Sequence, residues 1–142
     1  MRISQKTVYA VQVLIALAER APNRTPIQLR EIAETYELPF KFLEQIAIPL
    51  KAAGWIHGRR GKDGGYALAV TPSQLKLGDI LWRLEGSSSL LEGRVDASVQ
   101  DTLGAILNRC QASVDAILDS ITLSDIVSDV HDRKAPTIDY SI

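Results

Sequence analysis

Arg59-Arg60-Gly61-Lys62-Asp63-Gly64-Gly65-Tyr66-Ala67-Leu68 is the stretch that decides the fold of this 142-residue chain. From Tyr66 onward large apolar residues alternate with alanine, which is the period of a β-strand, and Trp55-Ile56 supplies an apolar segment before the stretch. Asp63-Gly64-Gly65 gives the backbone the freedom that a tight hairpin needs. The stretch therefore predicts a two-stranded hairpin whose cationic, glycine-rich tip is suited to bind an anion.

Three helical patterns precede this hairpin. The first spans residues 4–20 with Ser4 as its N-cap, and the second opens at Thr25-Pro26 or at Gln28. A tight turn leads into the third helix, over residues 39–53. Helix, short helix, turn, helix and hairpin in this order predict a winged helix-turn-helix. In that fold the third helix enters a DNA major groove and the hairpin is the wing.

The composition limits the class of protein. The length fits one domain, or a small domain with an appendage. With no run of 18 apolar residues we expect no membrane span, and a single cysteine excludes an intrachain disulfide and a cysteine-rich metal site. We therefore expect a cytoplasmic protein. Residues 1–86 carry 12 Lys/Arg and 8 Asp/Glu, a balance of +4, whereas residues 87–142 carry 4 and 9, a balance of −5. This split indicates either two differently solvated surfaces or a basic binding head with an acidic remainder.

The second half of the chain predicts an appendage to the head. Residues 75–84 read as a short helix, and residues 87–100 as a polar connection. A long helix then starts near Asp96 or Ser98. Its apolar stripe recurs in steps of 3 and 4 residues at Val99, Leu103, Ile106, Cys110, Val114, Ile117 and Ile121. Such a stripe is best covered by a second copy of the chain; the alternative is a helix folded back on its own head.

These patterns give a mainly α-helical fold with a small β-hairpin. We divide the chain into a winged helix-turn-helix domain over residues 1–86 and a connecting loop over residues 87–100. A dimerisation helix with a following helix occupies residues 101–126, and a C-terminal tail residues 127–142.

Six segments, in order and spacing, resemble the IscR-type (Rrf-two) family of winged helix-turn-helix transcriptional regulators. They are Leu29-Arg30-Glu31-Ile32-Ala33-Glu34, Phe42-Leu43-Glu44-Gln45-Ile46, Pro49-Leu50-Lys51-Ala52-Ala53-Gly54, the wing motif from Arg60 to Ala69, Gly78-Asp79-Ile80-Leu81 with Leu84-Glu85-Gly86, and Ile121-Thr122-Leu123-Ser124-Asp125-Ile126. The resemblance implies a homodimeric, sequence-specific DNA-binding regulator, usually a repressor.

Many members of that family carry an iron–sulfur cluster on three cysteines between the Glu-Gly motif and the long helix. Here residues 87–100 contain no cysteine, and Cys110 lies further along, inside the helix. One thiolate per chain does not replace three. The chain therefore resembles the branch of the family without the cluster, and we expect no cofactor and no metal.

The head offers two kinds of DNA-binding candidates. Phosphate contacts are expected from the cations of the first helix, the third helix and the wing, which are Lys6, Lys41, Lys51, Arg59, Arg60 and Lys62. Gly61, at the tip of the wing, is a further DNA-binding candidate. On the third helix Phe40, Lys41, Glu44 and Gln45 are the exposed early positions, where Gln45 suits adenine and Glu44 suits cytosine. Glu44 equally suits an ion pair with Lys41. Gly64, Gly65 and Tyr66 are expected to shape the wing, with Tyr66 packing it against the head.

Other readings of the chain remain open. A winged helix also serves as a protein-interaction module, and Cys110 is either a packing residue on the stripe or a redox-responsive thiol or interchain disulfide. His57 and His131 lack metal-ligand spacing, and no nucleophile–base arrangement indicates an enzyme. From the sequence we expect double-stranded DNA and a second copy of the chain as partners. The effector is unknown, and we expect no membrane to be involved.

Overall fold

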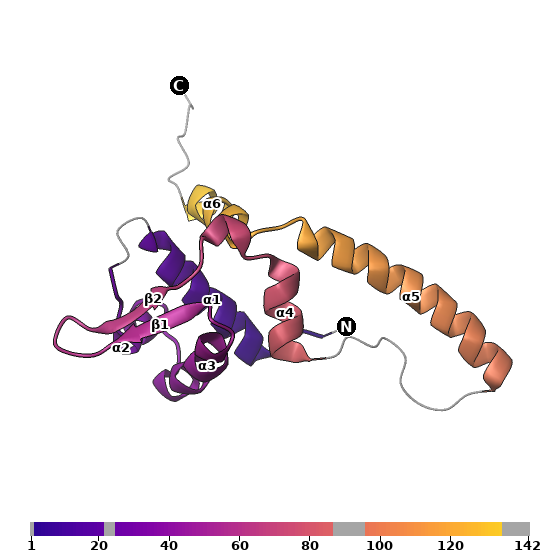
Figure 1. The fold of residues 1–142 in the computed structure, drawn as a ribbon, viewed down its shortest axis with the longest axis horizontal. Helices are drawn as coiled ribbons and strands as arrows, with labels where there is room; N and C mark the ends of the chain where they lie inside the picture. Colours follow the sequence, from indigo (N-terminus) through magenta and orange to yellow (C-terminus); the bar gives the residue numbers. More distant parts are fainter. Residues whose placement is uncertain (1, 22–24, 87–95, 135–142) are drawn as a thin grey trace, which may run out of the picture.

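A computed structural model of the chain describes residues 2–21, 25–86 and 96–134 (Figure 1). The head contains α1 (Gln5–Glu19), α2 (Leu29–Thr35), α3 (Phe40–Ala52), the hairpin β1 (Ile56–Arg59) and β2 (Gly65–Leu68), the short turn η2 (Pro72–Gln74) and α4 (Leu77–Glu85). A long helix, α5 (Ala97–Asp119), extends from the head as an arm, and α6 (Leu123–Lys134) follows it. The element order confirms the predicted winged helix-turn-helix with a long C-terminal helix.

The head is built around α1. Ser4 caps this helix, because its side-chain oxygen accepts a hydrogen bond from the backbone N–H of Thr7. Its Val13 and Leu14 are fully buried, and the helix contacts α3, α6, β2 and α4. From α3, Leu43 and Leu50 enter the same core.

The second helix begins later than Thr25-Pro26. Residues before α2 are extended, and Ile27 pairs with Tyr66 of β2 through two backbone hydrogen bonds of 2.8 Å. Because the Ile27 backbone groups are used in this ladder, the helix starts after Gln28, which was the other expected position. No side-chain cap forms at Gln28, and Glu31 pairs instead with Arg20.

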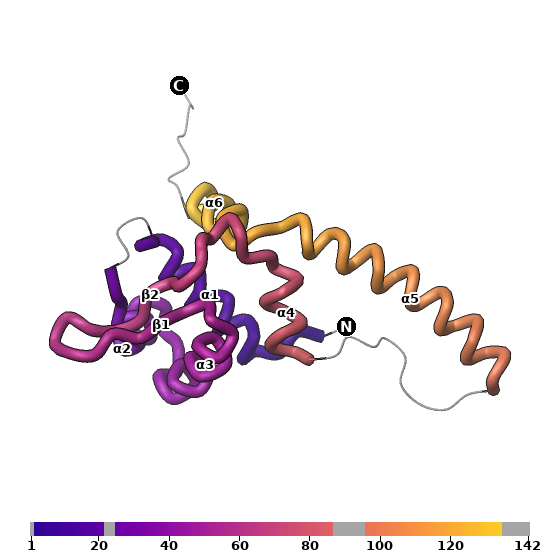
Figure 2. The backbone as a smooth tube through the Cα atoms, viewed as in Figure 1, coloured from indigo at the N-terminus to yellow at the C-terminus, as the bar shows by residue number. Residues whose placement is uncertain are grey.

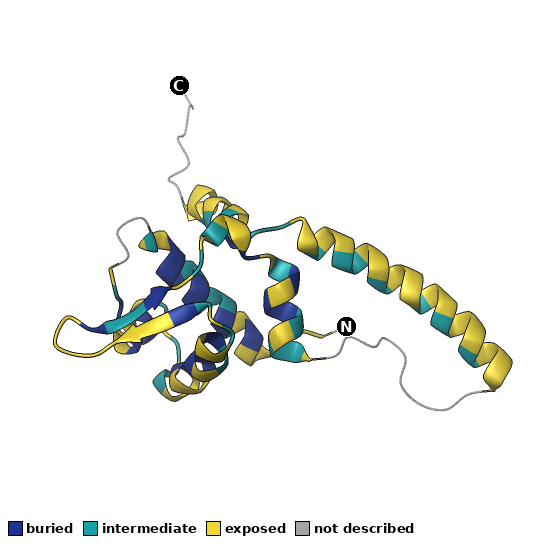
Figure 3. Ribbon diagram, in the orientation of Figure 1, coloured by how far each residue is buried: buried dark blue, intermediate teal, exposed yellow. Residues whose placement is uncertain are grey.

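The arm α5 and the following helix α6 differ in how they pack against the head. In Figure 2 the tube of α5 projects beyond the head, with its C-terminal end nearest the head, whereas α6 packs on the head. Leu123 at the start of α6 is fully buried, and its N–H donates to the carbonyl of Leu75 at 2.8 Å. Figure 3 shows the contrast: no residue of α5 is buried, so the alternative of a helix folded back on its head is wrong.

The long helix starts at Ala97, as expected from Asp96 or Ser98, because the carboxylate of Asp96 accepts the N–H of Ser98 and caps it. The expected connection 87–100 therefore ends earlier than residue 100. The expected tail from residue 127 is helical as far as Lys134. Thr122 and Asp125 exchange side-chain-to-backbone hydrogen bonds of 3.0 and 3.1 Å, a capping box that starts α6. Residues 87–95 and 135–142 lie outside the described residues.

Candidate nucleic-acid interface

The third helix, α3, presents a polar face to solvent. Its buried side packs on the head through Leu43, Ile46, Ala47 and Leu50. The opposite side carries exposed residues one turn apart, which are Lys41, Glu44, Gln45, Ile48 and Lys51. The structure thus places four of the five candidates predicted for this helix together on one accessible face.

Phe40 differs from the other α3 candidates. Its ring is half-buried against the core, and the guanidinium carbon of Arg30 lies 4.6 Å from the ring centroid. A cation at that distance is attracted by the face of the ring. Phe40 therefore holds Arg30 of α2 beside the start of α3, rather than standing exposed as expected.

The wing is an antiparallel hairpin in which Ile56 faces Leu68 and Arg59 faces Gly65. At its tip the N–H of Gly64 donates to the carbonyl of Gly61 at 3.0 Å. The cations Arg59, Arg60 and Lys62 are all exposed around this turn. The predicted cationic tip is therefore present, and it projects from the head (Figure 1).

Two residues attach the wing to the head. Gly65 has φ +140°, and a Cβ on it would lie 2.5 Å from the backbone carbonyl of Ile27, so only glycine allows this approach. The ring of Tyr66 is half-buried against the core. Both residues hold the wing as expected.

A second cationic site lies at the start of α1, where exposed Lys6 and Arg83 line a shallow pocket of about 170 Å³ between α1, α3 and α4. Beside it the backbone N–H of Ser4 donates to Glu85 at 2.7 Å. Hydrogen bonds from the Thr7 hydroxyl and from Ser4 lower the pKa of Glu85 below its usual range, which keeps this carboxylate charged. Arg83 and Arg30 are not among the predicted DNA-binding residues, because they lie on α4 and α2, outside the wing and the first and third helices; their positive charge was the only available signal.

The arm exposes the predicted apolar stripe. Val99, Leu103, Ile106 and Ile117 are between 38% and 62% exposed, and Cys110 on the same stripe is also exposed. Val114 is half-buried, and so is Ile121, which lies just past the end of α5 rather than on it as expected. Near its C-terminal end the arm contacts α4, where the indole N–H of Trp82 donates to Asp115. The stripe is therefore open along most of α5 in the single chain.

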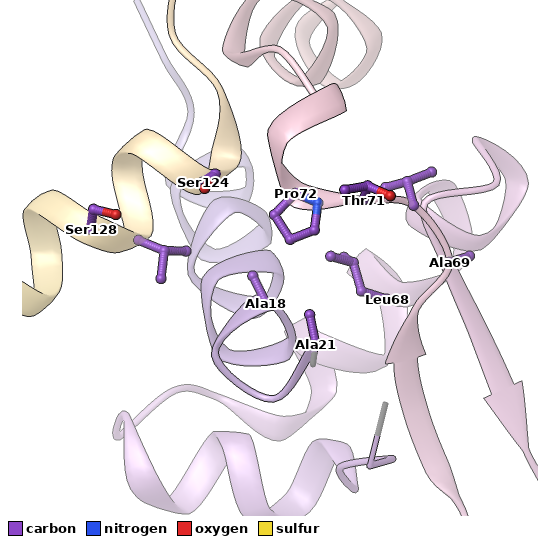
Figure 4. A pocket seen from close by; sticks show the side chains of 10 residues that line it. Ala18, Ala21, Leu68, Ala69, Thr71, Pro72, Ser124 and Ser128 are labelled. Atoms are coloured by element: carbon purple, nitrogen blue, oxygen red, sulfur yellow. The ribbon is translucent and has the colours of Figure 1, made fainter. Parts of the chain in front are cut away.

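A pocket of about 540 Å³ opens where β2, η2, α1 and α6 meet (Figure 4). Its lining combines apolar side chains with hydroxyl groups and carries no charged side chain; it includes Ala18, Leu68, Thr71, Pro72, Ser124 and Ser128. The pocket joins the base of the wing to the helix that follows the arm.

The described part of the chain shows neither a membrane span nor a group of metal ligands. None of its helices combines the length and the apolar character that crossing a membrane requires. Within residues 2–21, 25–86 and 96–134 no three His, Cys, Asp or Glu side chains are grouped as metal ligands would be.

Comparison with known proteins gives consistent matches. A family model described as Rrf2, iron-dependent transcriptional regulator, matches residues 3–129. The HTH-type transcriptional regulator CymR of Bacillus subtilis (strain 168) is 36% identical over 128 residues, covering 90% of this chain and 91% of CymR. The putative HTH-type transcriptional regulator slr0846 of Synechocystis is 36% identical over 145 residues, covering 95% and 93%. The solved structure of T. potens IscR is similar with a TM-score of 0.76 and 31% identity, covering 96% of this chain and 93% of that one.

Proposed function

Because the chain belongs to the Rrf2 family of DNA-binding transcriptional regulators, we propose that it acts as a homodimeric, sequence-specific repressor in the cytoplasm. Membership in the family confirms the resemblance seen in the sequence, and the relatives are regulators rather than enzymes. The observation that carries the proposal is the pairing of an exposed polar face on α3 with a cationic wing on the same small head. Together they supply base contacts and phosphate contacts.

Iron chemistry does not fit the donor groups of this chain, although the family is described as iron-dependent. The sequence has one cysteine and two histidines. Cys110 lies on α5, His57 on β1 and His131 on α6. A cluster bound by several thiolates has no matching ligand set here. We therefore propose a regulator that acts without an iron–sulfur cluster.

The arm supports the homodimer. Its 23 residues are about 34 Å long at 1.5 Å per residue, and its apolar stripe is open. A second copy offers the same stripe, so two arms bury each other's apolar side chains in a symmetric pair. Two heads joined in this way would place their α3 helices in successive major grooves of a pseudo-palindromic site, about one helical turn apart.

The experiment that tests this function is retention of DNA by the full-length protein. A library of genomic fragments is bound at increasing salt, and the retained fragments are sequenced. We expect binding that weakens steeply with salt and selects a repeated site with two-fold symmetry. Absence of salt-sensitive retention would instead favour a winged-helix module that binds proteins. Sedimentation of the free protein tests the dimer separately.

The selected site then tests repression. Placed between a promoter and a reporter, it is expected to lower expression when the protein is present. Raised expression would overturn repression while leaving DNA binding intact.

A further inference from the structure

Ile48 is the most exposed large apolar side chain among the described residues, at 69%. It lies on α3, where its neighbours on the solvent side are charged or polar. Phe42, the other exposed large apolar residue of this helix, packs edge-on against Tyr9 of α1, with ring centroids 6.3 Å apart. No comparable contact accounts for Ile48 among the apolar residues packed on the core of the described chain.

Helix geometry puts Ile48 in the middle of the exposed face of α3. It follows Glu44 by four residues and Gln45 by three, so all three share one face. It also follows Lys41 by seven residues, which brings it back to within about 20° of the same direction. The buried Leu43, Ile46 and Leu50 occupy the opposite side. If α3 enters a major groove, the Ile48 side chain faces the base edges rather than the rim of the interface.

In the major groove the apolar group that a base pair offers is the C5 methyl of thymine. We propose that Ile48 is a specificity-determining residue that reads this methyl group in each half-site of the operator. Along the helix axis Ile48 and Gln45 are about 4.5 Å apart, close to the 3.4 Å between successive bases. The thymine is therefore expected on the base pair that Gln45 reads or on a neighbouring one.

This inference rests on the proposed DNA-binding function and is tested by removing single methyl groups from the DNA. In the site selected by the full-length protein, each thymine is replaced in turn by deoxyuridine, which keeps every hydrogen-bonding group. We expect one thymine in each half-site to respond, at symmetry-related positions. Removal of its methyl group in one half-site should lower the affinity about fourfold, and removal in both half-sites about fifteenfold.

Variants of the protein assign that effect to Ile48. Ile48→Ala is expected to bind the thymine and deoxyuridine sites equally. Ile48→Val should keep most of the penalty, which is the loss of affinity when thymine is replaced by deoxyuridine. Val8→Ala, a truncation of an exposed apolar residue on α1, is the matched control and should keep the whole penalty. Equal melting temperatures check that the variants are folded.

Two results overturn the inference: no thymine responds to loss of its methyl, or Ile48→Ala retains the same penalty at the same thymine. Loss of all salt-sensitive DNA binding by the unmodified protein would overturn the proposed function instead. Binding of the unmodified protein to unmodified DNA therefore distinguishes failure of this inference from failure of the proposed function.

Discussion

The indole nitrogen of Trp82 on α4 donates a hydrogen bond of 2.8 Å to Oδ1 of Asp115 on α5. The side-chain amide of Gln111 donates to the same oxygen at 2.9 Å. Nearby, Gly78 of α4 lies against the carboxylate end of the Asp119 side chain and against Leu118. These contacts join the arm to the head close to its C-terminal end.

Replacement of Asp115 by alanine should loosen this junction. The half-buried Trp82 N–H would lose its acceptor, which costs about 1–3 kcal/mol in the free energy of unfolding. Urea unfolding followed by tryptophan fluorescence, at one fixed protein concentration, measures the change. Asp101→Ala, an exposed aspartate toward the other end of α5, is the control and should cost less than about 0.5 kcal/mol. Equal losses in the two variants would mean that the hydrogen bond does not stabilise the junction.

Removal of two wing cations, in Arg59→Ala/Arg60→Ala, should weaken binding to every DNA sequence alike. Each lost phosphate contact reduces the slope of log affinity against log salt by about 1. Titration of specific and random duplexes at several salt concentrations gives the slope. Arg133→Ala, an exposed arginine on α6, serves as the control. An unchanged slope in the wing variant would remove the wing from the interface.

A different pattern is expected for Gln45→Ala on α3. Loss of a bidentate base contact costs about 1–3 kcal/mol on the preferred site and less on sites altered at that one base pair. Affinities for a panel of single-base variants of the selected site reveal the position. The same loss on all sequences would show that Gln45 reads no base. The matched comparison is Lys51→Ala, for which a uniform loss is expected because Lys51 is a phosphate candidate.

A charge placed on the stripe of the arm should break the dimer. Ile106→Glu buries a carboxylate in the proposed symmetric interface, and an unpaired buried charge costs several kcal/mol. We expect the dimer dissociation constant to rise by at least about a hundredfold, measured by sedimentation at a series of concentrations. The head should remain folded, because Ile106 is half exposed in the single chain. Asn108→Glu, on the opposite side of α5, is the control, and dissociation of both variants alike would argue against the stripe as the interface.

Gly65, the first residue of β2 beside the turn of the wing, gives a prediction about stability. In Gly65→Ala the new methyl would meet the backbone of Ile27, and the positive φ adds strain of about 1–2 kcal/mol. Gly61→Ala also places alanine at a positive φ, +110°, but in open space. The melting temperature should therefore fall further for Gly65→Ala than for Gly61→Ala. Similar values would show that the close approach to Ile27 contributes little.

The sequence was sufficient for the features that depend on neighbouring residues. Ser4 caps α1 as expected, the glycines turn the hairpin, and the 3- and 4-residue steps of the stripe identify the arm. Features that depend on distant partners were not predictable in this way. Of the two expected starts of α2, Gln28 is correct and Thr25-Pro26 is wrong, and the pairing of Ile27 with Tyr66 that decides between them has no local signal.

The candidate interface shows the same division. Periodicity was enough to place Lys41, Glu44 and Gln45 on an exposed face of α3. The contact of Arg30 with Phe40 is tertiary, so no local pattern predicts that Phe40 is partly covered. Ile48 was overlooked because an isoleucine inside a helix is normally assigned to the core.

The ladder between Ile27 and Tyr66 has a mechanical consequence. The segment that leads into α2 and α3 is joined to strand β2 of the wing by two backbone hydrogen bonds, so α3 and the wing cannot move relative to each other at this point without breaking them. The spacing between α3 and the wing is therefore fixed. A duplex whose grooves do not match that spacing must bend or twist to bind, and the free-energy cost of this deformation depends on the DNA sequence. The protein can therefore discriminate among DNA sites by their stiffness and groove width, at base pairs that its side chains never touch.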